Sequence, residues 1–123
     1  MSYCERHTVA LTTDASGDCT AYTPVVSGKV ISVKYTKTNF SDGVDFDATG
    51  DISGVEIWNQ DNVNATQTIY PRAATHSTAG VAALYAAGGS AVLDHVRVAN
   101  ERIKIVVAAG GNVTTGSVTI ILE

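Results

Sequence analysis

Four aspartates lie close together in the first half of the chain and are the first candidates for metal chemistry. They are Asp42, Asp45, Asp47 and Asp51. Calcium takes about six to eight oxygen ligands, and clustered carboxylates can supply several of them. The spacing does not match an EF-hand loop, because the alternating ligands and the closing glutamate are missing. We therefore prefer a solvated strand face with turn-forming aspartates, and we expect no cofactor.

Two further sets of reactive side chains lack the rest of a recognised motif. Cys4 and His7 have the Cys-x-x-His spacing of a zinc site, but further sulfur or imidazole ligands are scattered along the chain. Ser90, Asp94 and His95 have the residue types of a hydrolytic triad, without the Gly-x-Ser-x-Gly elbow of one hydrolase class. A surface histidine and an N-terminal cysteine are the simpler interpretations.

Carboxylate pairs and glycine pairs complete the candidates for catalysis. Glu56 and Glu101 have the residue type needed for glycoside hydrolysis but lie outside any motif. Gly88-Gly89 and Gly110-Gly111 precede no helix that carries Lys-Ser or Lys-Thr, so they are turns and not phosphate loops. The sequence thus predicts a protein that is not an enzyme.

Aromatic side chains could form a flat platform that binds sugars, although core or interface positions are the preferred interpretation. The candidates are Trp58, Tyr22, Tyr35, Tyr70 and Tyr85. Alternation in Val-Glu-Ile-Trp at 55–58 places Trp58 on the face opposite Val55 and Ile57. We therefore expect an exposed Trp58 that needs a partner.

Alternating apolar and polar residues predict short β-strands along most of the chain. The clearest is 29–38, and 7–14 and 18–26 are expected to pair as a hairpin that turns at Ser16-Gly17. About eight or nine such strands, separated by Gly, Asp or Asn, are typical of β-sandwiches and barrels. We predict an all-β, antiparallel β-sandwich, with a jelly roll as first choice.

One segment, 71–92, interrupts this pattern. It is rich in alanine and glycine, has one charged residue, Arg72, and is too long for an ordinary turn. Disorder fits poorly, because Leu84 and Tyr85 are apolar and favour burial. The segment is predicted to be one long ordered loop, or a short helix around 78–87 that ends at Gly88-Gly89.

Composition restricts the kind of partner. The chain has 123 residues, which predicts a single domain over 1–123 with a flexible N-terminus at 1–6. Its net charge is −4 with eight Lys and Arg, which disfavours nucleic-acid binding. Only 16% of residues are charged, which indicates a surface partly covered by a partner.

The first residues lack the apolar core of a signal peptide and no apolar run could span a membrane, so cytoplasmic synthesis is expected.

Several stretches of the chain carry a family resemblance. They include Tyr-Pro-Arg-Ala-Ala-Thr-His at 70–76, together with 9–33, 84–89, 99–108 and 110–112. They resemble a family of small tailed-phage proteins encoded near the capsid genes. The resemblance implies a virion structural protein, namely a head decoration or cement protein assembled in the host bacterial cytoplasm. Jelly-roll cement proteins sit on the head surface at local three-fold axes, often as trimers. The resemblance therefore implies a homotrimer bound to the major capsid protein.

For the interface with capsid subunits we expect apolar and planar side chains, mostly in the long segment, where Leu84 and Tyr85 anchor either this contact or the end of the sandwich itself. These are Trp58, Tyr70, Pro71, Arg72, His76, Leu84 and Tyr85. Two alternatives stay open from the residues. One is a carbohydrate-binding jelly-roll module on the virion surface, and the other is a head–tail connector or tail component.

Overall fold

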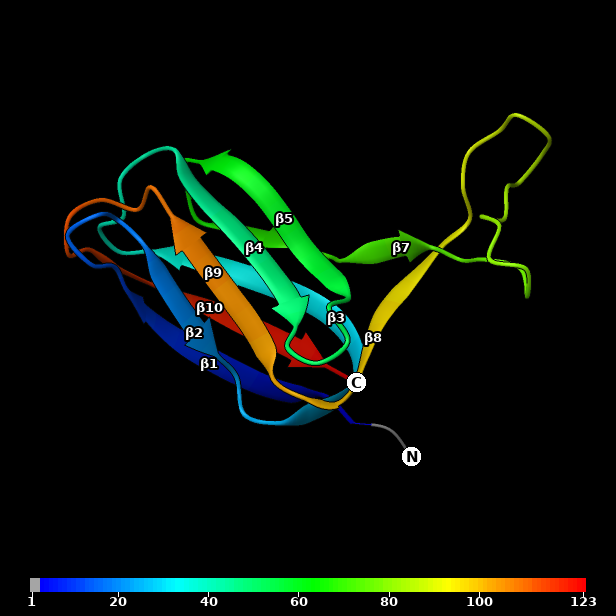
Figure 1. Cartoon of the computed structure of the whole chain (residues 1–123), viewed down its shortest axis with the longest axis horizontal. Helices are drawn as coiled ribbons and strands as arrows, with labels where there is room; N and C mark the ends of the chain where they lie inside the picture. The colour runs from blue at the N-terminus through cyan, green and yellow to red at the C-terminus, as the bar shows by residue number, and fades with distance from the viewer. Residues whose placement is uncertain (1–2) are drawn as a thin grey trace.

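The computed structural model describes residues 3–123 and consists of strands, turns and loops (Figure 1). Its strands are β1 (Glu5–Thr12), β2 (Cys19–Tyr22), β3 (Val26–Lys37), β4 (Val44–Gly50), β5 (Glu56–Val63), β6 (Gln67–Ile69), β7 (Arg72–Ala74), β8 (Leu93–Glu101), β9 (Ile103–Ala108) and β10 (Thr115–Leu122). The described residues contain no helix, and hence none that is long and apolar enough to cross a membrane.

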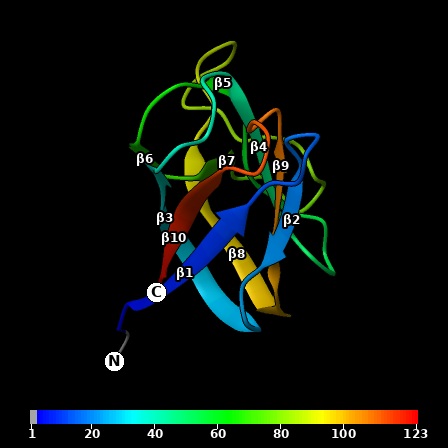
Figure 2. The same cartoon turned by 90° about the vertical axis from the view of Figure 1, so that its left-hand side faces the viewer.

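The strands form two antiparallel sheets. The six-stranded sheet has the order β1-β10-β3-β8-β7, with β6 beside β3, and the four-stranded sheet has the order β2-β9-β4-β5. β3 is long enough to pair with β8 through its first half and with β6 through its second half. The two sheets lie as layers in Figure 2, with the core between them. The prediction of an all-β protein with antiparallel sheets is confirmed.

The expected hairpin between 7–14 and 18–26 is wrong, because β1 and β2 belong to different sheets. β1 pairs with β10 along its whole length, whereas β2 pairs with β9. Asp14 shapes the connection, since its Oδ1 accepts hydrogen bonds from the backbone N–H groups of Ser16 and Asp18 at 2.8 and 3.1 Å. β1 begins at Glu5, within the expected N-terminal tail, and residues 1–2 lie outside the described part.

Aromatic side chains from both sheets join in the centre of the core. The rings of Tyr35 on β3 and Phe46 on β4 lie 4.7 Å apart between centroids, across the two layers. Phe46 in turn stacks on Trp58, at 4.6 Å with an interplanar angle of 17°. Phe40 packs beside both Tyr35 and Phe46, at 6.0 and 6.3 Å. These contacts hold the two layers in register, because each large ring fills space left by the others.

The position of Trp58 corrects the sequence expectation, since the side chain is only 5% exposed. A register shift between β4 and β5 pairs Thr49 with Glu56 but Ala48 with Trp58. One extra residue on β5 therefore breaks the alternation, and Ile57 and Trp58 both face the core. The indole Nε1–H donates to Oε1 of Gln60 at 3.1 Å, so its polar atom is satisfied.

A buried carboxylate, Glu101, holds the turn between β4 and β5. Its Oε1 accepts hydrogen bonds from the backbone N–H groups of Ile52 and Ser53, both at 2.9 Å, and from the Ser53 hydroxyl at 3.2 Å. A Cβ on Gly50 would lie 2.5 Å from this oxygen, so the carboxylate needs glycine there. The Ser53 N–H first, and then the Ile52 N–H and the Ser53 hydroxyl, lower the pKa of Glu101 below its ordinary value of 4.5.

Replacing Trp58 tests whether it is a core residue. Trp58→Ala removes a stacked ring and leaves a cavity, so it should lower the free energy of unfolding by about 3–5 kcal/mol. Tyr85→Ala, which truncates a side chain that is 77% exposed, should change it by less than about 0.5 kcal/mol. Urea denaturation measures both values. Equal stability of the two variants would contradict the burial of Trp58 against Phe46.

Glu101 should make stability depend on pH in the acid range. Its folded-state pKa lies below 4.5, so its stabilising effect is present above pH 4.5 and is lost as the pH falls further. Glu101→Gln should be less stable than the wild type at about pH 7, and this difference should shrink towards about pH 3. Thermal midpoints over this range test it, with Asp18→Asn, an exposed carboxylate in another turn, as the control. If the difference in thermal midpoint between Glu101→Gln and the wild type does not vary with pH, the lowered pKa of Glu101 is refuted.

Candidate functional site

The largest departure from the two sheets is an arm formed by residues 70–93, which projects from one end of the molecule (Figure 1). Its base is the pairing of β7 with the start of β8, where Arg72 lies opposite His95 and Ala74 opposite Leu93. Within the described chain, no core residue lies between Val63 and Val96. The arm thus owes its order to main-chain hydrogen bonds and not to burial in the core.

Three residues of the arm form a closed ring of backbone hydrogen bonds. The N–H of Thr75 donates to the carbonyl of Val92 at 2.8 Å, the N–H of Val92 to that of Ala83 at 2.9 Å, and the N–H of Ala83 to that of Thr75 at 2.8 Å. Three chain segments therefore meet at one junction. Beyond it the arm divides into two loops, 76–82 and 84–91, closed by the bridges His76–Ala82 and Leu84–Ala91.

Turn-forming residues close each of these loops. In the first loop, the Ser77 hydroxyl accepts hydrogen bonds from the N–H groups of Ala79 and Val81 at 3.2 and 3.4 Å. In the second loop, the N–H of Tyr85 donates to the carbonyl of Ser90 at 3.0 Å. Gly88 has a φ of +69°, which other residues adopt rarely. The small residues and glycines of this segment therefore form two ordered turns.

The arm carries much of the exposed apolar surface. Ten large apolar side chains of the described chain are exposed, and the arm holds five of them: Tyr70, Val81, Leu84, Tyr85 and Leu93. Tyr85 is 77% exposed and Val81 is 65% exposed. Apolar groups gathered on an exposed element mark a contact surface more often than scattered ones do.

The predicted interface residues divide into two groups. Tyr70, Arg72, His76, Leu84 and Tyr85 are exposed on the arm, whereas Pro71 and Trp58 are buried in the protein. The guanidinium of Arg72 donates to the carbonyl of Pro71 at 2.8 Å, and no carboxylate within residues 3–123 forms an ion pair with it. Arg72 can therefore receive a carboxylate from another molecule.

The four candidate calcium ligands do not converge. Asp42 pairs with Lys37, Asp45 accepts a hydrogen bond from the N–H of Asn62 at 3.0 Å, and Asp51 pairs with Arg102 at 2.8 Å. In the described chain no three His, Cys, Asp or Glu side chains are grouped so as to hold a metal ion. That result covers Cys4 and His7 as well, and both cysteines are free.

Asp47 instead forms a carboxyl pair with Glu56 on the neighbouring strand. Oδ1 of Asp47 is buried without a hydrogen-bond partner in the described structure, which is costly for an ionised group. Partial burial first, and then the neighbouring Asp47 carboxyl, raise the pKa of Glu56 to about 7. Glu56 and Glu101 thus lie in different surroundings, Glu56 beside Asp47 and Glu101 under the β4–β5 turn.

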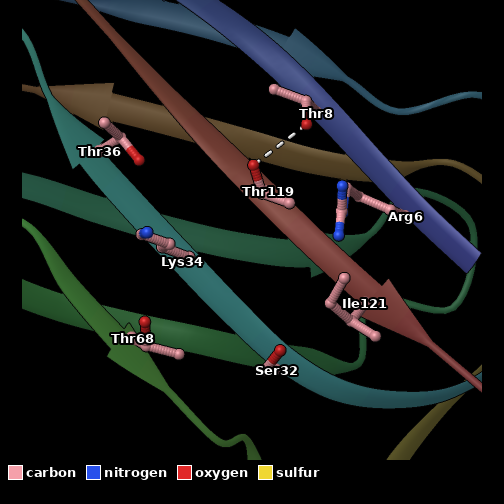
Figure 3. Close-up of a pocket in the computed structure, with 8 residues that line it drawn as sticks. All are labelled: Arg6, Thr8, Ser32, Lys34, Thr36, Thr68, Thr119 and Ile121. Atoms are coloured by element: carbon pink, nitrogen blue, oxygen red, sulfur yellow. Dashed lines mark hydrogen bonds between the residues drawn. The ribbon is translucent and has the colours of Figure 1, made fainter. Parts of the chain in front are cut away.

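A second candidate site is a groove on the outer face of the six-stranded sheet, which the sequence interpretation missed. It has a volume of about 400 Å³ and is lined mostly by polar side chains from four strands (Figure 3). The lining residues are Arg6, Thr8, Ser32, Lys34, Thr36, Thr68, Thr119 and Ile121. The alternation of apolar and polar residues identified the polar face of 29–38. The sequence pattern could not show that β10, β1 and β6 place their polar side chains beside this face, because that depends on the strand order.

Comparison of this chain with protein-family models, with curated proteins and with solved structures finds no match.

The raised pKa of Glu56 predicts a second pH dependence. Its folded-state value of about 7 exceeds the ordinary 4.5, so the associated stability is complete below pH 4.5 and is lost as the pH rises through 7. Glu56→Gln should remove this loss and be more stable than the wild type at about pH 8. Thermal midpoints between about pH 5 and 8 measure it, and Asp61→Asn on the same strand is the control. A Glu56→Gln variant that keeps the wild-type slope would disprove the shift.

Proposed function

We propose that this chain is a non-enzymatic structural protein of a bacteriophage virion that decorates the head by binding capsid subunits through its arm. The exposed apolar arm is the observation that carries the proposal. It combines five large apolar side chains with an ordered backbone and small neighbouring residues, which let another surface approach closely. The resemblance of 70–76 and 84–89 to phage virion proteins falls on the same element.

The strand order supports a jelly roll, a fold common among viral capsid domains. With β6 and β7 set aside, the sheets reduce to the rows β1-β10-β3-β8 and β2-β9-β4-β5. Numbered along the chain, these eight strands read 1-8-3-6 and 2-7-4-5, which is the order that two nested Greek keys produce. Fold alone does not imply function, so this order is secondary support.

The arm suits a role that depends on many weak contacts. An arm of this size presents a modest apolar surface, and a single such contact would be of low affinity. Copies that associate with each other, for which a homotrimer is our first expectation, would engage several capsid sites at once. Linked contacts of this kind bind far more tightly than one contact alone.

The other candidate functions have less support. An aromatic sugar-binding platform built around Trp58 loses its main residue, because that ring is buried against Phe46. A head–tail connector or tail component would also need an exposed contact arm, and it differs from decoration only in where the protein binds. The binding position on the particle therefore separates these two roles.

Charged substitutions at the end of the arm test the docking role. Leu84→Asp/Tyr85→Asp should weaken binding to undecorated capsids by at least about thirtyfold, because both anchors become charged. Both side chains lie outside the core, so the thermal midpoint should stay near that of the wild type. Sedimentation with purified capsids measures binding, and cryo-electron microscopy locates the bound density at local three-fold positions.

The matched control is Val113→Asp, which places a charge on an exposed apolar residue of the β9–β10 turn. This turn lies at the end of the molecule opposite the arm (Figure 1). The control should bind capsids as the wild type does. Equal loss in the two variants, or density at the tail vertex alone, would overturn the decoration proposal.

A further inference from the structure

The groove on the outer face of the six-stranded sheet has a defined arrangement of rows. Strand pairing places Thr8, Thr119, Lys34 and Thr68 side by side across β1, β10, β3 and β6. The next row holds Arg6, Ile121 and Ser32. Figure 3 shows these side chains projecting from one face of the sheet. A row across four strands is a continuous polar surface, not a set of isolated residues.

The groove is positively charged although the protein is acidic. Its lining holds Arg6 and Lys34 but no Asp or Glu, in a chain of net charge −4. Neither cation forms an ion pair with a carboxylate of residues 3–123. The other outer face differs, since Asp45, Asp47 and Glu56 lie on the four-stranded sheet. The groove can therefore attract anions although the chain as a whole is acidic.

Hydroxyl groups make up most of the remaining lining. Five of the eight lining residues are Ser or Thr. Thr8 and Thr119 are hydrogen-bonded to each other at 3.1 Å, and either hydroxyl can be the donor. A hydroxyl both donates and accepts, so such a row matches a ligand that itself carries many hydroxyls. The methyl groups of threonine and Ile121 provide small apolar areas between them.

We propose that this groove binds an acidic oligosaccharide, with its carboxylate or sulfate groups at Arg6 and Lys34 and its hydroxyls along the threonines. The backbones of β1 and β3 are separated by one strand, or about 10 Å, so the two cations contact different units of one extended ligand. β10 and β3 are inner strands of the sheet and give the site a rigid base.

An acidic peptide fits this groove less well. Peptides that bind sheets do so by adding a strand at an edge. The groove lies instead on the face, where β10 already pairs with β1 on one side and β3 on the other. The backbone of a peptide would therefore find no strand edge to pair with and would have to use isolated hydroxyls, whereas the many hydroxyls of a saccharide match the row of side chains.

The groove and the arm are separate features, and the groove proposal does not depend on capsid binding. The arm projects from the end of the sheets, while the groove lies over β1, β10, β3 and β6. A decorating protein would hold such a groove at the surface of the particle in many copies, where weak saccharide contacts add up.

Titration calorimetry with four probes tests the ligand class at about 150 mM salt. The probes are a galacturonate hexamer, a sulfated hexasaccharide, neutral maltohexaose and hexaglutamate. We expect at least one of the two acidic saccharides to bind. The one that binds more tightly shows whether the groove prefers carboxylate or sulfate groups. We expect maltohexaose and hexaglutamate to bind at least about tenfold more weakly. Absence of binding by both acidic saccharides, or equal binding by hexaglutamate, would overturn the proposal.

Substitutions locate the binding at the groove. Arg6→Ala/Lys34→Ala should weaken saccharide binding by at least about tenfold, because charge-assisted hydrogen bonds are lost. Thr8→Val/Thr119→Val keeps the shape and the charge, and should weaken binding about threefold because the hydroxyl contacts to the ligand are lost. Lys104→Ala, on the outer face of the four-stranded sheet, is the control and should have no effect. Thermal midpoints confirm that each variant is folded. Equal loss in the control, or no loss in both groove variants, would refute the location.

Discussion

The contact between Tyr35, Phe46 and Trp58 is the constraint on which the rest of the structure depends. Phe46 lies 4.7 Å from the Tyr35 ring of the opposite sheet and 4.6 Å from Trp58 on its own sheet. Large rings set the spacing of two layers because protein cores tolerate few voids. The bulge on β5 completes this cluster, because the extra residue turns the Trp58 side chain towards the core.

Packing of this kind leaves the outer faces and the ends of the sheets free for other roles. The two outer faces differ in charge, with Arg6, Lys34 and a row of hydroxyls on one and the carboxyl groups of Asp47 and Glu56 on the other. Neither property is needed to hold the layers together, because the core cluster contains apolar side chains from both sheets. Binding surfaces can therefore vary on this scaffold without loss of the core, as is common for folds that support many functions.

The arm is stabilised by backbone hydrogen bonds and not by a hydrophobic core. With almost no apolar burial, it depends on the ring of hydrogen bonds among Thr75, Ala83 and Val92 and on the turns beyond it. A buried loop would leave backbone groups without partners, whereas an exposed arm can pair them within itself or with water. Its apolar side chains thus remain available for another molecule, and its order lowers the entropic cost of binding one.

Local pattern determined the all-β class, most of the strands and the unusual character of 71–92, because alternation and turn residues act between near neighbours in the chain. It also singled out Leu84 and Tyr85, but the structure decided that both side chains are exposed. Only the tertiary structure decided that β1 and β2 lie in different sheets, that Trp58 is buried, and that Arg6 and Lys34 share one groove. These outcomes depend on which strands pair across long distances in the chain, and periodicity carries no information about strand order.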